Sequence, residues 1–161
     1  MAKRSPEDDL RTIDGFIEFI ESVARSPLQR ERVRSTAAVP LSGAGLNALR
    51  LIARSGPIPV SEVARQLGVD QSTASRQIRP LEQGGLVERT GDDKDRRVAW
   101  LAITADGRAV LERVHGMRRR DVGIVLADWS AEERAHLADL LTRFQTAMLE
   151  APARTRVDNA S

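Results

Sequence analysis

Cysteine and tyrosine are absent from this sequence of 161 residues, and aromatic residues make up only 3% of it. Without cysteine, the chain cannot form a disulfide, a thiolate metal site, a catalytic thiol or a thiol-based peroxide sensor. The scarcity of aromatic rings argues against sheet-type RNA-binding modules and single-strand binders, because such proteins stack bases on aromatic side chains. Thiol chemistry is therefore excluded, and recognition of single-stranded nucleic acid is disfavoured.

Long apolar runs and catalytic motifs are also missing. No segment near the N-terminus has the length and hydrophobicity of a signal peptide or a membrane span, so we expect a cytoplasmic protein with no membrane partner. There is no Walker loop, dinucleotide fingerprint or nucleophile elbow. The two histidines, His115 and His136, lie in separate predicted helices beside charged residues, where surface exposure is the default. We therefore predict that the protein is not an enzyme and has no catalytic residue, metal or cofactor.

A large net charge is likewise absent. The formal charge is only +2 at pH 7, although the isoelectric point is about 9.9 because arginine dominates the basic residues. Net charge alone gives weak support to a nucleic-acid partner. Evidence for such a partner has to come from the local distribution of the charged residues.

Residues 60–68 carry a compact helical pattern. Val60, Val63, Ala64 and Leu67 recur at the spacing of one helical face. Gly68 follows at once, where a residue with left-handed backbone would end the helix. Such a helix with a tight glycine turn is typical of the first half of a helix-turn-helix, whose second helix enters a DNA major groove.

The second half begins at Asp70, which can cap a helix whose inner face carries Ala74, Ile78 and Leu81. Its outer face carries hydrogen-bond donors and no acidic residue. We expect these side chains to contact phosphates or base edges: Gln71, Ser72, Thr73, Ser75, Arg76 and Arg79. The alternative is an ordinary solvated helix face, which this pattern alone does not exclude.

Two alternating runs, residues 86–90 and 99–103, surround a charged connection and predict a β-hairpin. A hairpin directly after a helix-turn-helix is the wing of a winged helix. We expect Lys94, Arg96 and Arg97 to reach backbone phosphates or a narrow minor groove. The three aspartates of the tip would bond locally and stiffen it, and residues 58–60 would add a short third strand. An ordinary charged hairpin tip is the alternative.

These motifs together resemble the MarR family of dimeric winged-helix transcription regulators. The resemblance rests on residues 70–76, 81–82, 85–89, 95–97 and 101–104 together with Gly107, and it extends from residue 41 to about residue 150. It implies a DNA partner, a homodimer and a small effector, often aromatic or phenolic. Two residues depart from the family pattern. Pro80 removes one backbone hydrogen bond from the recognition helix, and Gly45 stands where glutamine is common.

The whole pattern predicts one mainly α-helical domain over residues 1–161, with six helices and a small β-hairpin wing. Residues 42–103 form the winged helix-turn-helix, with Ser42 as a helix cap. Residues 8–25 and 104–150 form helices with apolar stripes that a small winged domain cannot cover alone, so pairing of two subunits, in an intertwined dimer, would bury them. We expect a solvated connector at residues 26–40, with a phosphate or effector contact as the alternative, and a disordered tail at residues 151–161.

The expected function is sequence-specific binding of double-stranded DNA as a homodimer. A two-fold dimer presents two recognition helices, so the operator should be a near-palindrome with half-sites roughly 10 bp apart. The family resemblance implies repression of nearby genes and release by an effector. Phe16, Phe19, Trp129 and the arginines near Arg30 are candidates for an effector pocket, but plain core is the preferred interpretation of the aromatic residues. The alternative function is a winged-helix module for protein contacts without specific DNA binding.

Overall fold

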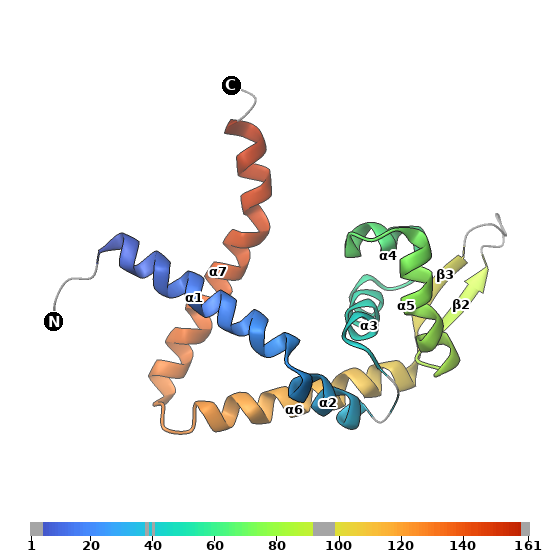
Figure 1. The fold of residues 1–161 in the computed structure, drawn as a ribbon, viewed down its shortest axis with the longest axis horizontal. Helices are drawn as coiled ribbons and strands as arrows, with labels where there is room; N and C mark the ends of the chain where they lie inside the picture. Colours follow the sequence, from blue (N-terminus) through green and yellow to red (C-terminus); the bar gives the residue numbers. More distant parts are fainter. Residues whose placement is uncertain (1–4, 38, 40, 92–98, 159–161) are drawn as a thin grey trace. The chain divides into compact units, whose positions relative to one another are not determined.

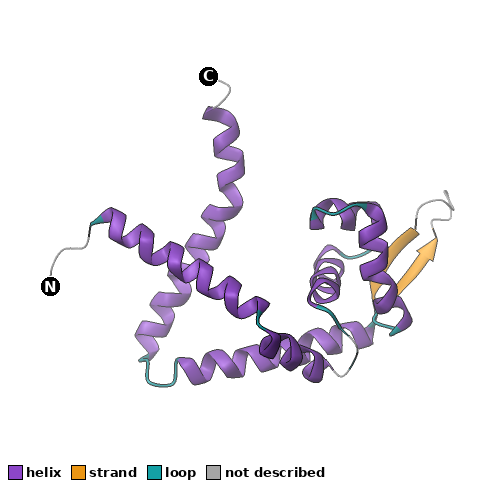
Figure 2. Ribbon diagram, in the orientation of Figure 1, coloured by secondary structure: helices purple, strands orange, loops and turns teal. Residues whose placement is uncertain are grey.

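The structure, a computed structural model, describes residues 5–37, 39, 41–91 and 99–158. The chain divides into two compact units, Met1–Met117 and Arg118–Ser161. The elements appear in Figure 1, and Figure 2 shows how far helix predominates over strand. In chain order they are α1 (Pro6–Arg25), α2 (Pro27–Ala37), α3 (Gly43–Ser55), β1 (Ile58–Pro59), α4 (Val60–Leu67), α5 (Gln71–Gln83), β2 (Val87–Gly91), β3 (Ala99–Ile103), α6 (Ala105–Val125) and α7 (Ala131–Asp158).

The winged helix-turn-helix of the first unit has the predicted order of helices and strands. The described strands form one antiparallel sheet in the order β1-β3-β2, with Arg89 and Ile58 both opposite Leu101. The predicted hairpin and the short third strand are therefore confirmed. The core lies between this sheet, α3, α4, α5 and the first half of α6. Its fully buried large side chains are Leu49, Leu51, Ile52, Val63, Ile78, Leu81, Leu101, Val110 and Val114.

The start of α6 is held closely against the turn between α5 and β2. The hydroxyl of Thr104 donates to the Gly85 carbonyl at 2.7 Å and accepts from the Gly107 amide at 3.1 Å. A Cβ added to Gly107 would stand 2.2 Å from the Leu86 carbonyl oxygen. Only glycine allows the two backbones to approach this closely, so this contact fixes the position of the wing relative to α6.

Seven helices occur in the described residues, where the sequence suggested six. The difference is α2, which lies in the expected solvated connector. The Ser26 hydroxyl caps its first turn by accepting from the Gln29 amide at 3.1 Å, and Pro27 occupies the first helical position, where proline is favoured. Only Val33 and Ala37 are buried in α2, which explains why the apolar spacing in this arginine-rich segment gave little sign of a helix.

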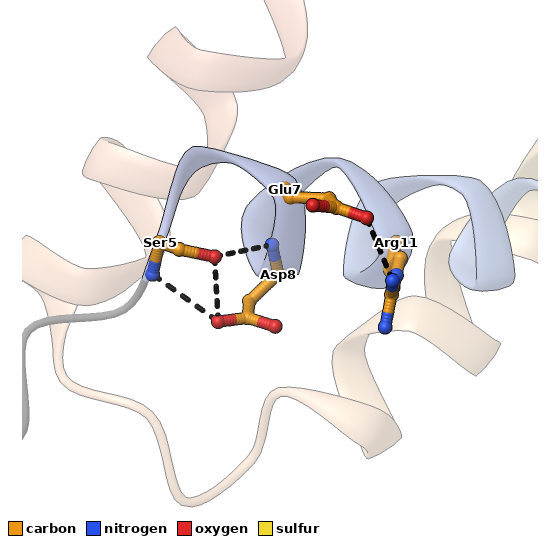
Figure 3. A network of polar contacts seen from close by, with 4 residues as sticks. All are labelled: Ser5, Glu7, Asp8 and Arg11. Carbon is orange, nitrogen blue, oxygen red and sulfur yellow. Dashed lines mark hydrogen bonds and ion pairs between the residues drawn. The ribbon is translucent and has the colours of Figure 1, made fainter.

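The N-terminal helix α1 begins at Pro6, two residues before the predicted boundary. Ser5 and Asp8 cap each other: the Asp8 amide donates to the Ser5 hydroxyl at 3.1 Å, and the Ser5 amide donates to the Asp8 carboxylate at 3.2 Å (Figure 3). Glu7 and Arg11 form an ion pair of 2.7 Å one turn apart (Figure 3). The caps lower the pKa of Asp8 through the hydrogen bonds from Ser5.

No residue of α1 is buried within this single chain. Its exposed large apolar side chains are Leu10, Ile13, Phe16, Ile17, Phe19, Ile20 and Val23. Phe16 and Phe19 are 54% and 60% exposed, and Trp129 is 42% exposed, so none of these rings belongs to the core of the single chain.

The second unit contains the end of α6 and all of α7. Helix α6 runs without interruption across the boundary at Met117 and ends at Val125, a few residues before the predicted end near Trp129. The predicted capping box at the start of α7 is confirmed, because the Glu133 amide donates to the Ser130 hydroxyl at 3.1 Å and the Ser130 amide donates to the Glu133 carboxylate at 2.8 Å. Helix α7 continues to Asp158, through residues that were expected to form a disordered tail.

The long apolar side chains of α7 are exposed in the single chain, as in α1: Leu140, Leu141, Phe144, Met148 and Leu149. None of the helices in the described ranges combines the length and hydrophobicity that crossing a membrane requires. Those same ranges hold no group of three or more His, Asp or Glu side chains arranged to bind a metal ion.

Candidate nucleic-acid interface

The predicted helix-turn-helix is formed by α4 and α5. Val60, Val63 and Ala64 are buried on the inner face of α4. Gly68 ends the helix with a left-handed backbone, φ 65° and ψ 32°, and the Val69 amide donates back to the Ala64 carbonyl at 3.1 Å. An L-residue with a side chain would be strained at this φ, so the glycine sets the tight turn that aims α5.

Helix α5 buries one side completely and presents the other to solvent. Ala74 and Ile78 are fully buried, and Leu81 is almost so. Of the six predicted contact residues on this helix, four are exposed, namely Gln71, Ser72, Arg76 and Arg79, whereas Thr73 and Ser75 are half-buried. The structure therefore places four of them together on one accessible surface.

Asp70 organises the first turn of α5. Its side chain accepts from the Thr73 amide at 2.8 Å, which confirms the predicted cap. The same carboxylate also accepts from the hydroxyls of Ser72 and Thr73, at 2.5 and 2.7 Å. The hydrogen bond from the Ser72 hydroxyl, followed by those from Thr73, holds the pKa of Asp70 well below its usual range, so its side chain is a carboxylate at neutral pH.

The hydroxyl of Thr73 also accepts a hydrogen bond from Nη2 of Arg76, at 2.9 Å. Asp70, Thr73 and Arg76 therefore form a chain in which each member orients the next. The sequence predicts that the outer face of α5 carries hydrogen-bond donors. In the structure, the hydroxyls of Ser72 and Thr73 donate their single protons to Asp70.

A hollow of about 290 Å³ lies between the start of α3 and the outer part of α5. Its lining residues are Leu41, Ser42, Gly45, Thr73, Arg76, Gln77, Pro80 and Leu81. A Cβ added to Gly45 would stand 3.3 Å from the Ser42 hydroxyl oxygen and 3.4 Å from a Leu41 methyl carbon. A side chain at position 45 would therefore press on the Ser42 and Leu41 side chains unless they shift slightly.

Pro80 does not end α5, which continues to Gln83. Proline has no amide hydrogen, so the Arg76 carbonyl has no helical donor from this position. The Pro80 carbonyl itself accepts from the Gly84 amide at 3.0 Å, which closes the end of the helix.

Arg89 ties the wing to the recognition helix. Its Nε lies 2.5 Å from the Glu82 carboxylate, which joins strand β2 to the last turn of α5. The sequence does not predict this ion pair, because nothing in the spacing across the turn at Gly84 and Gly85 shows that the side chains of Glu82 and Arg89 meet. The predicted wing contacts Lys94, Arg96 and Arg97 lie outside the described residues.

A second ion pair lies on the outer side of α4. The Arg65 guanidinium donates twice to Glu62, at 2.8 and 2.5 Å, and the Gln66 amide donates to the same carboxylate at 2.8 Å. The hydrogen bonds from Arg65 and then Gln66 lower the pKa of Glu62 to about 2, and the pair raises the pKa of Arg65. The charge of Arg65 is thus balanced within its own helix.

The sequence model of the MarR family matches residues 41–99, the segment that contains this interface. The chain is 33% identical over 102 residues to the HTH-type transcriptional regulator YxaD of Bacillus subtilis, covering 63% of this chain and 71% of YxaD. The chain belongs to the MarR family, and it is an HTH-type transcriptional regulator.

Two further proteins similar to this chain are a transcriptional repressor and a protein solved in complex with DNA. The HTH-type transcriptional repressor MdtR of Bacillus subtilis is 29% identical over 120 residues, which is 74% of this chain and 77% of MdtR. Among solved structures, Streptococcus pneumoniae FabT in complex with DNA shares the fold, with a TM-score of 0.56 and 22% identity over 90% of this chain and 96% of FabT.

Proposed function

We propose that this protein is a homodimeric, cytoplasmic transcriptional repressor that binds a palindromic operator and is released by a small effector. The observation that carries the proposal is the division of α5 into two faces. Ala74, Ile78 and Leu81 anchor the helix in the core, and the opposite face presents Arg76 and Arg79 to solvent. A helix anchored in this way can enter a major groove without disturbing the fold.

The exposed groups on α5 suit duplex DNA. Arg76 and Arg79 can bond guanine in the groove or the phosphates beside it, and Gln71 can bond adenine or a phosphate. The half-buried Ser75 would contact the backbone at the edge of the groove. Lys94, Arg96 and Arg97 of the wing would bind phosphates or the minor groove next to it. The FabT structure supports this assignment, because it is a complex of the same fold with DNA.

The exposed apolar surfaces of α1 and α7 support the proposed dimer. Side chains such as Phe16, Phe19 and Phe144 are about half exposed in the single chain, although monomeric proteins rarely leave such contiguous apolar stripes in water. A second copy of residues 8–25 and 104–150 would bury these stripes and place two α5 helices on one duplex. The operator should then have two-fold symmetry, with half-sites about 10 bp apart.

Repression is supported by the name of the transcriptional repressor MdtR. Release by an effector is supported by the family resemblance alone. A ligand bound beside the dimer helices would weaken DNA binding if it prefers a dimer in which the spacing of the two α5 helices does not fit successive major grooves. The loss of DNA affinity cannot exceed that preference. An aromatic or phenolic effector is the class to test first.

The direct test is a mobility-shift titration with the promoter next to the coding gene and with a scrambled duplex of equal length. We expect a clear preference for the promoter, a symmetric footprint and loss of the complex when the effector is added. Equal affinity for both duplexes at low salt would overturn DNA recognition and would favour a module for protein contacts.

A further inference from the structure

We propose that Asp70 is a specificity-determining residue of the DNA interface: it fixes the hydroxyl of Ser72 as an acceptor for a base amino group and holds Arg76 through Thr73. This inference rests on the proposed DNA-binding function and adds to it the chemistry by which the first turn of α5 distinguishes bases from phosphates.

The hydroxyl proton of Ser72 is engaged within the protein. A serine hydroxyl has one proton and two lone pairs, and here the proton is donated to Asp70 over 2.5 Å. Phosphate oxygens are only acceptors, so they cannot bond this hydroxyl while Asp70 holds its proton. The exocyclic amino groups of adenine and cytosine are donors in the major groove, and they can bond its free lone pairs. Ser72 is exposed near the N-terminal end of α5, the part of a recognition helix that meets base edges.

Asp70 also positions Arg76, through the hydroxyl of Thr73. Thr73 donates its proton to Asp70 and accepts from one nitrogen of Arg76, so the direction of both bonds is set by the carboxylate. A guanidinium has five donors, and this contact uses one of them. The others stay available for guanine, while the side chain loses much of its rotational freedom before DNA arrives. Asp70 thereby acts on base reading through Thr73 as a positioning residue.

Asp70 also changes the charge at the start of α5. A helix N-terminus attracts phosphates through its free amides and dipole. Asp70 places a negative charge at this end of α5 and occupies the Thr73 amide. Phosphates of an arbitrary sequence are therefore repelled from a position where they would otherwise bind. This repulsion weakens binding to every duplex. Only a duplex that presents an amino group to Ser72 and a guanine to Arg76 gains contacts that offset it.

The test compares Asp70→Ser with the unmodified protein. Serine keeps the helix cap but removes the negative charge. The hydroxyls of Ser72 and Thr73 then no longer donate to a carboxylate, so their protons are available to DNA. We expect about fivefold tighter binding to a scrambled duplex, the effect of one unit charge at contact distance in water. Duplexes selected from a randomised pool should lose their preference at the base pairs read by Ser72 and Arg76. Asp106→Asn removes an equal charge from the first turn of α6 and should change neither quantity.

A second variant, Ser72→Ala, isolates the base contact. This variant should bind the operator about tenfold more weakly, because it loses the contact with one base pair. Its affinity for the scrambled duplex should not change. A uniform loss on every sequence would mean that Ser72 binds a phosphate and would overturn the proposal. Thermal melting of each variant separates these results from unfolding. If Asp70→Ser does not melt cooperatively, Asp70→Asn is the second variant. Its amide oxygen keeps the helix cap, and its NH2 group donates to the Thr73 hydroxyl and so reverses that one hydrogen bond. This variant should lose specificity at the base pair that Arg76 reads.

The outcomes distinguish this inference from the function beneath it. If the unmodified protein selects no sequence, the proposed function fails. If it selects a defined operator and Asp70→Ser selects the same operator with the same affinity for scrambled DNA, only the role of Asp70 fails.

Discussion

The Arg113 guanidinium of α6 donates to the Ala37 carbonyl at 2.8 Å, although 76 positions of chain separate the two residues. Its Nε reaches the neighbouring Thr36 carbonyl at 3.4 Å. A cation at the last carbonyls of a helix satisfies groups that have no partner within that helix. Arg113 therefore fastens the end of α2 to α6, and with it the connection between α1 and the winged domain.

Arg113→Ala should lower the free energy of unfolding by about 1 kcal/mol, because one charge-assisted hydrogen bond to backbone carbonyls is lost. Urea titration measures the change, and amide exchange should quicken at the end of α2. Arg108→Ala removes an exposed arginine from the same helix and is the matched control. Equal effects of the two substitutions would show that the contact with Ala37 contributes nothing specific.

Gly107→Ala should destabilise the protein by about 1–3 kcal/mol or more, because the new methyl group would overlap the Leu86 carbonyl and neither backbone can move freely. Gly123→Ala offers a control in the same helix, since a Cβ there meets nothing within 4 Å. That control should be neutral or stabilising by about 0.5–1 kcal/mol. Chemical denaturation checks both, and a stable Gly107→Ala variant would contradict the close approach.

Arg76→Ala should cost about 1–3 kcal/mol of operator binding and relax specificity at one base pair if the guanidinium reads guanine. Should Arg76 instead hold a phosphate, affinity would fall evenly on all sequences and the salt slope would shrink by about one. Titrations of the original and singly altered operators at several salt concentrations separate the two. Arg79→Ala, on the same exposed face, serves as the comparison.

The stability of the helix-turn-helix should depend on pH through Glu62. Its pKa is lowered from 4.5 to about 2 in the folded protein, so the unfolded chain binds more protons between these values. The contribution is fully present above pH 4.5 and disappears as the pH falls towards 2. Denaturation midpoints measured across this range should fall with acid less steeply in Glu62→Gln than in the unmodified protein. Parallel curves would show that the ion pair with Arg65 does not stabilise the fold.

Phe16→Asp should convert the proposed dimer into monomers, because a charged group would be buried in the apolar surface of α1. Operator affinity should fall about a hundredfold or more, since the two half-sites would no longer be held together. Analytical ultracentrifugation and mobility shifts measure these effects. Glu18→Ala, at an exposed polar position of α1, should change neither. A monomeric unmodified protein at micromolar concentration would contradict the dimer.

The helix-turn-helix was predictable because its signals are local. Gly68 and Asp70 mark the turn by their own backbone and capping chemistry, and the burial of Ile78 follows from spacing alone. Helix α2 was not predictable in this way. It is stabilised by a distant partner, Arg113, and buries only two apolar side chains.

The contact residues on α5 were predictable as a surface but not as a network. Spacing shows that Ser72 and Arg76 share the outer face, yet it does not show which hydroxyl protons Asp70 engages. The link between Arg89 and Glu82 depends on the path of the double-glycine turn. The roles of Lys94, Arg96 and Arg97 stay predictions.

Gly116 lies in the interior of α6, where glycine costs about 0.5–1 kcal/mol of helix stability relative to alanine. Without a side chain at this position, the neighbouring backbone amides are more open to water. We therefore expect the amide protons of this turn to exchange with solvent faster than those of the turns on either side of it.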